Sequence, residues 1–145
     1  MQGSETPMSE ELWKFDFSRV PEFDRVVEAR FHDVHITDRK DVETWEAKVR
    51  ELLAQFGYDL ILLINLGELR VHPRAGSTFG AVRSRVLADY AHISFRYGGD
   101  AWTRASINTS YALHGADSNL FATRDEALEA IREYLASLPA RPLST

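Results

Sequence analysis

The sequence contains no cysteine among its 145 residues. This absence excludes a disulfide framework, a thiolate metal site and a cysteine nucleophile. Long apolar runs are also missing, because the longest one, residues 60–66, is interrupted by Asn65, whereas a membrane-spanning helix needs about 20 apolar residues. The first ten residues are polar and lack the basic start and apolar stretch of a signal peptide. We therefore expect a cytoplasmic protein without a membrane span.

Positive charge is scarce relative to negative charge, since 17 Lys and Arg residues face 22 Asp and Glu residues, for a formal net charge of −5. This balance argues against a dedicated nucleic-acid binder. Hydrophobic residues make up 44% and aromatic residues 11% of the chain, enough for one packed core. We expect a single domain over residues 12–139, a flexible leader over 1–11 and a C-terminal tail over 140–145.

The common catalytic and cofactor motifs are absent as well. The chain has neither a glycine-rich phosphate loop of the GxGxxG or GxxxxGKS/T type nor a GxSxG nucleophile elbow. His32 and His35 are three residues apart, which on a strand points the two rings to opposite faces, and no HExxH motif accompanies them. We therefore predict no catalytic residue, no metal and no cofactor.

Hydrophobic periodicity divides the chain into alternating strands and helices. Short apolar or alternating segments predict strands near residues 13–17, 26–36, 60–66, 93–97 and 120–121, and His32 and Asp33 mark a bend or a hairpin turn within the second of them. Apolar stripes at spacings of three and four predict helices over residues 42–56, 77–90, 100–113 and 124–138. The order β-β-α-β-α-β-α-β-α predicts a single α/β domain, with a mixed sheet of about five strands covered by about four helices.

The centre of the predicted sheet carries the clearest signal. Leu60 to Ile64 are five consecutive large aliphatic residues, a pattern typical of a parallel strand with both faces covered. The helix before it is followed by Gly57, which suits the left-handed conformation that often closes a helix. A helix leading into such a strand indicates a right-handed βαβ crossover.

The loop after this strand, residues 67–80, combines features of an anion site. Open α/β sheets bind ligands outside the carboxyl ends of their strands, where this loop is expected, and it leads into a helix N-terminus, which favours anions. Its candidate site residues are cationic or carry hydroxyls: Arg70, His72, Arg74, Ser77 and Thr78. Two interpretations stay open: an interaction, anion or phosphorylation site, and an N-cap serine flanked by solvated arginines.

Three segments together resemble the STAS fold, and specifically its SpoIIAA-like (STAS/Sec14-type) branch. They are the helix from Val42 to Phe56 with the strand DLILLINL (59–66), the segment GELRVHPRAGSTFGAVRSRV (67–86), and the ending NLFATRDEALEAIREYL (119–135). The resemblance covers most of the chain, from about Asp24 to Leu138. It implies a STAS-type mixed sheet and a role in protein interaction or ligand binding rather than catalysis.

The resemblance also implies where a regulatory switch would lie. In the classical members, which are antagonists of anti-sigma factors, an Asp-Ser-x-Gly-like signature follows the central strand, and a partner kinase phosphorylates the serine. Here the matching segment is Pro73-Arg74-Ala75-Gly76, so the glycine is kept but Arg74 occupies the phosphoacceptor position. Ser77 and Thr78 are the substitute phosphoacceptors, and Asn65 replaces the usual acidic residue of the central strand.

The resemblance leads first to a non-catalytic regulatory domain that acts by protein–protein interaction in bacterial signalling, with its partner unidentified. This hypothesis predicts an exposed patch around Val71, Thr78 and Val82. A homodimer is a further candidate, because aromatic strands such as Trp13 to Phe17 often form an edge or an interface.

The alternative is a Sec14-like carrier or sensor of a small apolar or anionic ligand. Six aromatic residues would line its pocket, although as core residues they need no ligand: Trp45, Phe56, Phe79, Tyr90, Trp102 and Tyr111. A third hypothesis, an enzyme that uses His72 with Arg70 or Arg74 on an anionic substrate, has no catalytic motif behind it.

Overall fold

The computed structural model describes residues 13–101, 104–105 and 119–139. The strands are β1 (Lys14–Arg19), β2 (Val26–His32), β3 (Val34–Ile36), β4 (Leu60–Asn65), β5 (Leu69–Val71), β6 (Ala91–Tyr97) and β7 (Leu120–Phe121). The helices are α2 (Arg39–Ala54), α3 (Gly76–Tyr90) and α5 (Arg124–Ser137), with a 3-10 turn η1 at Pro73–Ala75. Five strands form one sheet in the order β1-β2-β4-β6-β7, while β3 and β5 form a separate two-stranded sheet.

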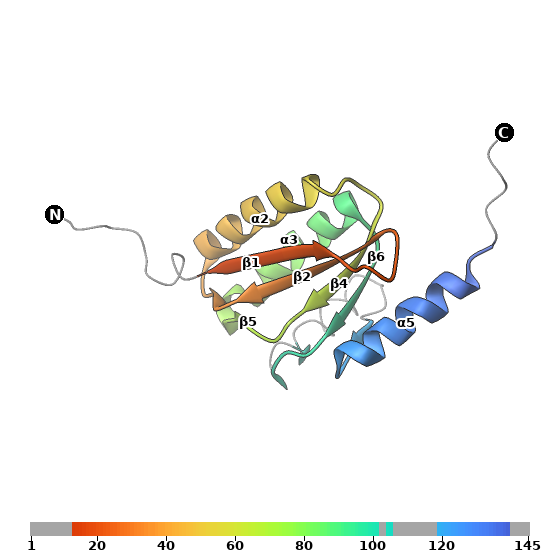
Figure 1. Cartoon of the computed structure of the whole chain (residues 1–145). Helices are drawn as coiled ribbons and strands as arrows, with labels where there is room; N and C mark the ends of the chain where they lie inside the picture. Colours follow the sequence, from red (N-terminus) through yellow and green to blue (C-terminus); the bar gives the residue numbers. More distant parts are fainter. Residues whose placement is uncertain (1–12, 102–103, 106–118, 140–145) are drawn as a thin grey trace.

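The main sheet is mixed, as the sequence predicts. β1 runs antiparallel to β2, whereas β2, β4, β6 and β7 run parallel to one another. Helices α2 and α3 cover one face of the sheet, and α5 packs against the other (Figure 1). The expected α/β class and five-stranded sheet are confirmed. The described residues contain three α-helices, because the fourth helix expected over 100–113 lies mostly outside them.

The central strand β4 is buried on both faces, which explains its continuous run of aliphatic residues. Leu62 and Ile64 belong to the core beneath α2 and α3. Ile61 and Leu63 belong to a second core beneath α5. Parallel neighbours β2 and β6 flank the strand. Burying a large aliphatic side chain contributes roughly 1.5–3 kcal/mol to stability. β4 therefore stabilises the packing of α2 and α3 on one face of the sheet and of α5 on the other.

The helix ends follow from local side-chain chemistry. The carboxylate of Asp38 accepts the backbone N–H of Asp41 at 3.0 Å and caps α2, and Gly57 beyond its C-terminus has a positive φ of 105°. Thr123 caps α5, where its hydroxyl accepts the backbone N–H of Glu126 at 3.2 Å. Among the described residues, no helix has the length and apolarity needed to cross a bilayer.

One expected boundary is confirmed and one is wrong. The bend expected at His32 and Asp33 lies at Asp33, whose φ of 54° ends β2, so that β2 and β3 join different sheets. A left-handed residue cannot continue a strand, and aspartate is one of the few non-glycine residues that adopts this conformation readily. At the other end of the chain, Leu138 lies beyond α5 with 43% of its surface exposed, so it does not extend the buried stripe of that helix.

Candidate functional site

The candidate loop is held in place by the small β3-β5 sheet. β3 follows β2 after the turn at Asp33 and β5 follows β4, so this sheet lies just beyond the carboxyl ends of those two strands (Figure 1). Val34 lies opposite Leu69 and Ile36 lies opposite Val71 in the parallel pairing. The position predicted for the loop, outside the carboxyl ends of the parallel strands, is therefore confirmed, but most of the loop belongs to β5, η1 and the start of α3.

Hydrogen bonds tie the loop to the start of α2. Arg74 Nε donates to the Thr37 carbonyl oxygen at 2.8 Å. Thr37 in turn donates its backbone N–H and its hydroxyl to the Asp41 carboxylate, at 2.8 Å and 2.6 Å. The buried Asp41 thus serves a structural purpose, and the N-terminal ends of α2 and α3 are fastened side by side.

His72 stabilises the conformation of the loop. Its ring Nδ1 accepts the backbone N–H of Arg74 at 3.2 Å, which caps the η1 turn. The backbone N–H of His72 donates to the Ile36 carbonyl oxygen at 2.7 Å. The side chain is exposed and lines neither of the hollows described below. A general base needs a cleft that holds its substrate within hydrogen-bond reach, so the geometry gives no support to the enzyme hypothesis built on His72.

The other candidate residues differ in their contacts: Arg70 forms an ion pair, whereas Ser77 and Thr78 lie at the start of α3. Arg70 on β5 is exposed and forms an ion pair with Asp100 at 3.2 Å. Ser77 is exposed and Thr78 is half-buried, both in the first turn of α3. The N-cap of this helix is Ala75, which offers no side-chain hydrogen bond. The interpretation of the loop serine as an N-cap is therefore wrong.

The exposed patch expected around Val71, Thr78 and Val82 is not present. Val71 has 5% and Val82 has 7% of its surface exposed, because both side chains pack into the core beneath α2 and α3. The outward side of the loop is polar instead. We call the exposed side chains of Arg70, His72, Arg74 and Ser77 the loop surface.

A second polar cluster, on the α5 face of the sheet, is not apparent from the sequence. Its centre is Glu28 on β2, only 2% exposed. The Glu28 carboxylate accepts two hydrogen bonds from Arg124 at 3.0 Å each, one from the Tyr97 hydroxyl at 2.6 Å and one from Arg30 at 3.3 Å. The cluster therefore joins β2, β6 and the first turn of α5.

The pKa values in this cluster follow from its contacts. Burial alone would raise the pKa of Glu28, but hydrogen bonds from Arg124, Tyr97 and Arg30 outweigh it and hold this pKa below its ordinary value. Burial and the adjacent carboxylate raise the pKa of Tyr97, so its hydroxyl keeps the proton that it donates. A fully bonded carboxylate and a protonated phenol have no spare group for catalysis, which makes the cluster a structural latch.

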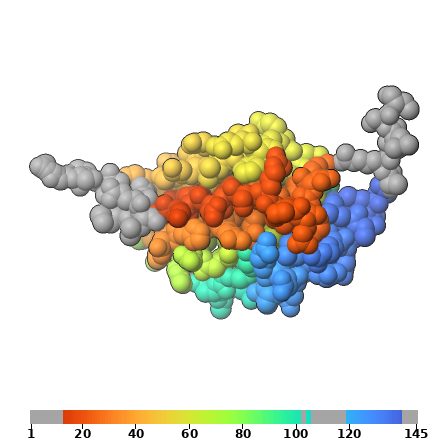
Figure 2. All heavy atoms as spheres, in the orientation of Figure 1, coloured from red at the N-terminus to blue at the C-terminus, as the bar shows by residue number. Residues whose placement is uncertain are grey.

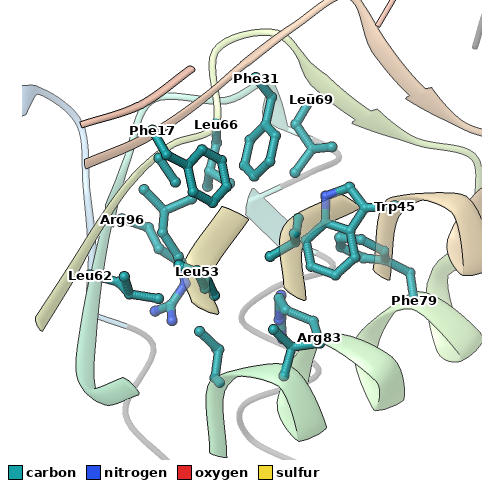
Figure 3. A pocket seen from close by; sticks show the side chains of 15 residues that line it. Phe17, Phe31, Trp45, Leu53, Leu62, Leu66, Leu69, Phe79, Arg83 and Arg96 are labelled. Carbon is teal, nitrogen blue, oxygen red and sulfur yellow. The ribbon is translucent and has the colours of Figure 1, made fainter. Parts of the chain in front are cut away.

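The opposite core contains a small cavity between the sheet and helices α2 and α3 (Figure 3). Its volume is about 30 Å³, room for one or two water molecules. Most of its lining is apolar, including Phe31, Trp45 and Phe79, but the side chains of Arg83 and Arg96 also reach it. Arg96 is fully buried, and its Nη2 donates to the Ser94 hydroxyl.

This cavity bears on the carrier hypothesis. Sites for drug-sized ligands usually enclose roughly 300–1,000 Å³, so the cavity is an order of magnitude too small. Trp45 and Phe79 are buried core residues, and Phe56 and Tyr90 pack against the same core, whereas Trp102 and Tyr111 lie outside the described residues. A more open hollow of about 310 Å³ lies between Val26, Ile61 and the end of α5, and its lining includes neither a residue of the loop surface nor any of the four described aromatic residues named above.

The histidines do not come together as metal ligands. His32 lies 3.8 Å from the Glu68 carboxylate, and His92 contacts Asp59 at 3.3 Å and the Tyr134 hydroxyl at 2.7 Å. Across the part of the chain that the structure describes, no group of three or more His, Asp or Glu side chains is placed to hold a metal ion.

Solved structures share this arrangement. The anti-sigma factor antagonist SpoIIAA in its unphosphorylated form matches with a TM-score of 0.50 and 18% sequence identity, over 83% of this chain and 97% of that one. The Bacillus cell fate determinant SpoIIAA in the phosphorylated form matches with a TM-score of 0.50 and 19% identity, over 82% and 100% of the two chains. No protein-family model and no curated protein matches the sequence. The chain thus has the STAS fold seen in SpoIIAA.

Proposed function

We propose that this chain is a non-catalytic regulatory domain that binds a partner protein through the loop surface, in bacterial signalling. The observation that carries the proposal is the polar, exposed loop surface itself, held at the carboxyl ends of β2 and β4 in a fold shared with an anti-sigma factor antagonist. Among the described residues, three ionisable side chains have structural roles: His72 caps a turn, Asp41 holds Thr37 and Glu28 binds Arg124 of α5.

Rigidity of the loop supports a docking role. Its backbone is paired with β3, and two further bonds, from His72 N–H to Ile36 and from Arg74 Nε to Thr37, anchor its second half. A preformed surface loses little conformational entropy on binding, so more of the contact energy appears as affinity. The loop surface is therefore suited to recognition of a protein in one defined orientation.

The charge of the loop surface indicates an acidic partner. Arg74 donates to a carbonyl, and within the described ranges no carboxylate forms an ion pair with it. Arg85 is exposed further along α3, whereas the chain as a whole has a net charge of −5. Arg74 and Arg85 are therefore exposed cations on an acidic protein, and such charges steer an acidic partner to one site.

Ser77 and Thr78 are the phosphoacceptors that we propose for a switch at this surface. Ser77 is exposed in the first turn of α3, where the helix dipole favours added negative charge. A phosphate there would also offset the charge of Arg74 and oppose docking of an acidic partner. Phosphorylation would thus release the partner without disturbing the fold.

Site-specific photo-cross-linking in cells of the source organism tests the proposal. A photoreactive amino acid at Ser77 is expected to capture one protein of defined mass, while the same group at Glu133, exposed on α5, is expected not to capture it. The proposal is wrong if position 77 yields no adduct, or if both positions yield the same adducts.

A further inference from the structure

Strand β1 forms one edge of the main sheet. It is the terminal strand of the order β1-β2-β4-β6-β7 and pairs with β2 alone among the described strands. In Figure 2 it runs across the visible face of the molecule, with α2 above it and β2 below it. An edge strand presents a row of N–H and C=O groups that a further strand can pair with.

The two faces of this edge differ in chemistry. Trp13, Phe15 and Phe17 are half-buried on the α2 side, where Phe15 and Phe17 both pack edge-on against Phe31 at centroid distances of 5.4 Å and 5.8 Å. Lys14 and Asp16 are exposed on the other face. The aromatic layer therefore reaches the rim of the sheet and is only partly covered there.

The segment from Trp13 to Phe17 is complementary to itself when it runs antiparallel. Residues directly opposite in an antiparallel pair point to the same face. With a two-fold axis at Phe15, Trp13 of one copy lies opposite Phe17 of the other, and Lys14 lies opposite Asp16. One face then joins aromatic to aromatic, and the other forms two ion pairs.

The neighbouring symmetric registers lack this match. An axis at Asp16 places two Asp16 carboxylates opposite each other, and an axis at Lys14 does the same for two ammonium groups. An axis at Phe17 sets Phe15 against Arg19 and loses both ion pairs. Like charges directly opposite are destabilising in antiparallel sheets, so the register centred on Phe15 is selected.

We propose that two copies of this chain dimerise through β1, with the two-fold axis at Phe15, to form one continuous ten-stranded sheet. Both α2 helices then lie on the same side of that sheet, because the axis is perpendicular to it. The loop surface is not part of this interface, so dimerisation and partner binding use different parts of the molecule.

Charge exchange on the exposed face tests the dimer. Sedimentation or light scattering of the full-length protein over a wide concentration range is expected to show a dimer. Asp16→Lys and Lys14→Asp each place like charges opposite at both symmetric pairs, and each is expected to weaken dimerisation about tenfold or more. Glu133→Lys makes the same charge change as Asp16→Lys on the exposed side of α5, and it is expected to leave the dimer intact.

A double variant and a mixture of the two single variants show whether the charges act at this interface or only through the overall charge of the protein. The double variant K14D/D16K restores opposite charges and is expected to dimerise like the wild type. An equal mixture of the two single variants is expected to form heterodimers, since every Asp then faces a Lys. A monomeric wild type, loss of the dimer in Glu133→Lys, or a mixture that stays monomeric would overturn the proposal.

Discussion

Arg124, in the first turn of α5, donates two hydrogen bonds of 3.0 Å to the carboxylate of Glu28, which lies 96 residues earlier on β2. The pairing is bidentate, the strongest geometry for a guanidinium and a carboxylate. It closes the α5 layer onto a strand that contributes to both cores of the protein. The latch therefore links the last helix of the fold to its first parallel strand.

Replacing Glu28 by Gln should destabilise the protein by about 3 kcal/mol, because one buried partner of a charged network is removed while the arginines remain. Urea unfolding followed by circular dichroism measures the loss. The control is Glu129→Gln, which breaks only an exposed ion pair with Arg132 and should cost about 1 kcal/mol or less. Equal losses in the two variants would contradict the latch.

Stability should fall in acid through Glu28. Its pKa is held below the ordinary value in the folded protein, so the unfolded chain binds this proton more readily. The contribution is complete above the ordinary glutamate pKa of about 4.3 and is lost as the pH falls through the lower, folded pKa. The stability difference between wild type and Glu28→Gln should therefore narrow progressively as the pH falls below about 5. A constant difference over this range would show that Glu28 is not the group responsible.

Two glycines should respond in opposite directions to alanine. Gly99 has a φ of +86°, and an added Cβ would lie 3.0 Å from the Leu66 Cβ, so Gly99→Ala should cost about 2 kcal/mol or more. Gly76 has a φ of −58° and open space around it. Gly76→Ala should stabilise the protein by about 0.5–1 kcal/mol. Thermal unfolding of both variants measures the contrast, and a destabilised Gly76→Ala protein would show that the described start of α3 is wrong.

Ser77→Glu should raise the stability of the protein and weaken its binding of an acidic partner. The first turn of α3 has no acidic residue and no side-chain cap, so a carboxylate there should raise stability by about 0.3–1 kcal/mol. The same charge should weaken binding of an acidic partner, as phosphorylation would. Ser77→Ala is the matched neutral control, expected to keep both properties near wild type. A Glu variant that binds as tightly as the wild type would remove Ser77 from the switch.

Much of the fold could be predicted from the sequence, because periodicity reports burial directly. The aliphatic run of β4 and the apolar stripes of α2 and α5 each identify an element that is buried in the structure. The small β3-β5 sheet could not be predicted, since strands of three residues are too short to show a period. The bend at Asp33 could be expected from the sequence, but the pairing of β3 with β5 in a second sheet could not.

The candidate loop and the Glu28 latch also differ in how far the sequence could predict them. The candidate loop could be found because its residues are adjacent in the chain and follow the central strand. The latch could not, because Tyr97 and Arg124 are 69 and 96 residues from Glu28. Alternation correctly sets Glu28 and Arg30 on the opposite face from Phe31, but the burial of that face depends on α5. The one sequence feature that pointed to the latch was the carboxylate of Glu28 itself, because β2 pairs with a strand on each side.

The proposed docking role of the loop surface is tested most directly by measuring the affinity of the cross-linked partner for Arg74→Glu. Lys48→Glu, the same charge change on an exposed residue of α2, is the control. Calorimetric titration should show binding at least about tenfold weaker for Arg74→Glu, with both variants folded and Lys48→Glu unchanged. Equal affinity of Arg74→Glu and wild type would contradict the proposed docking surface.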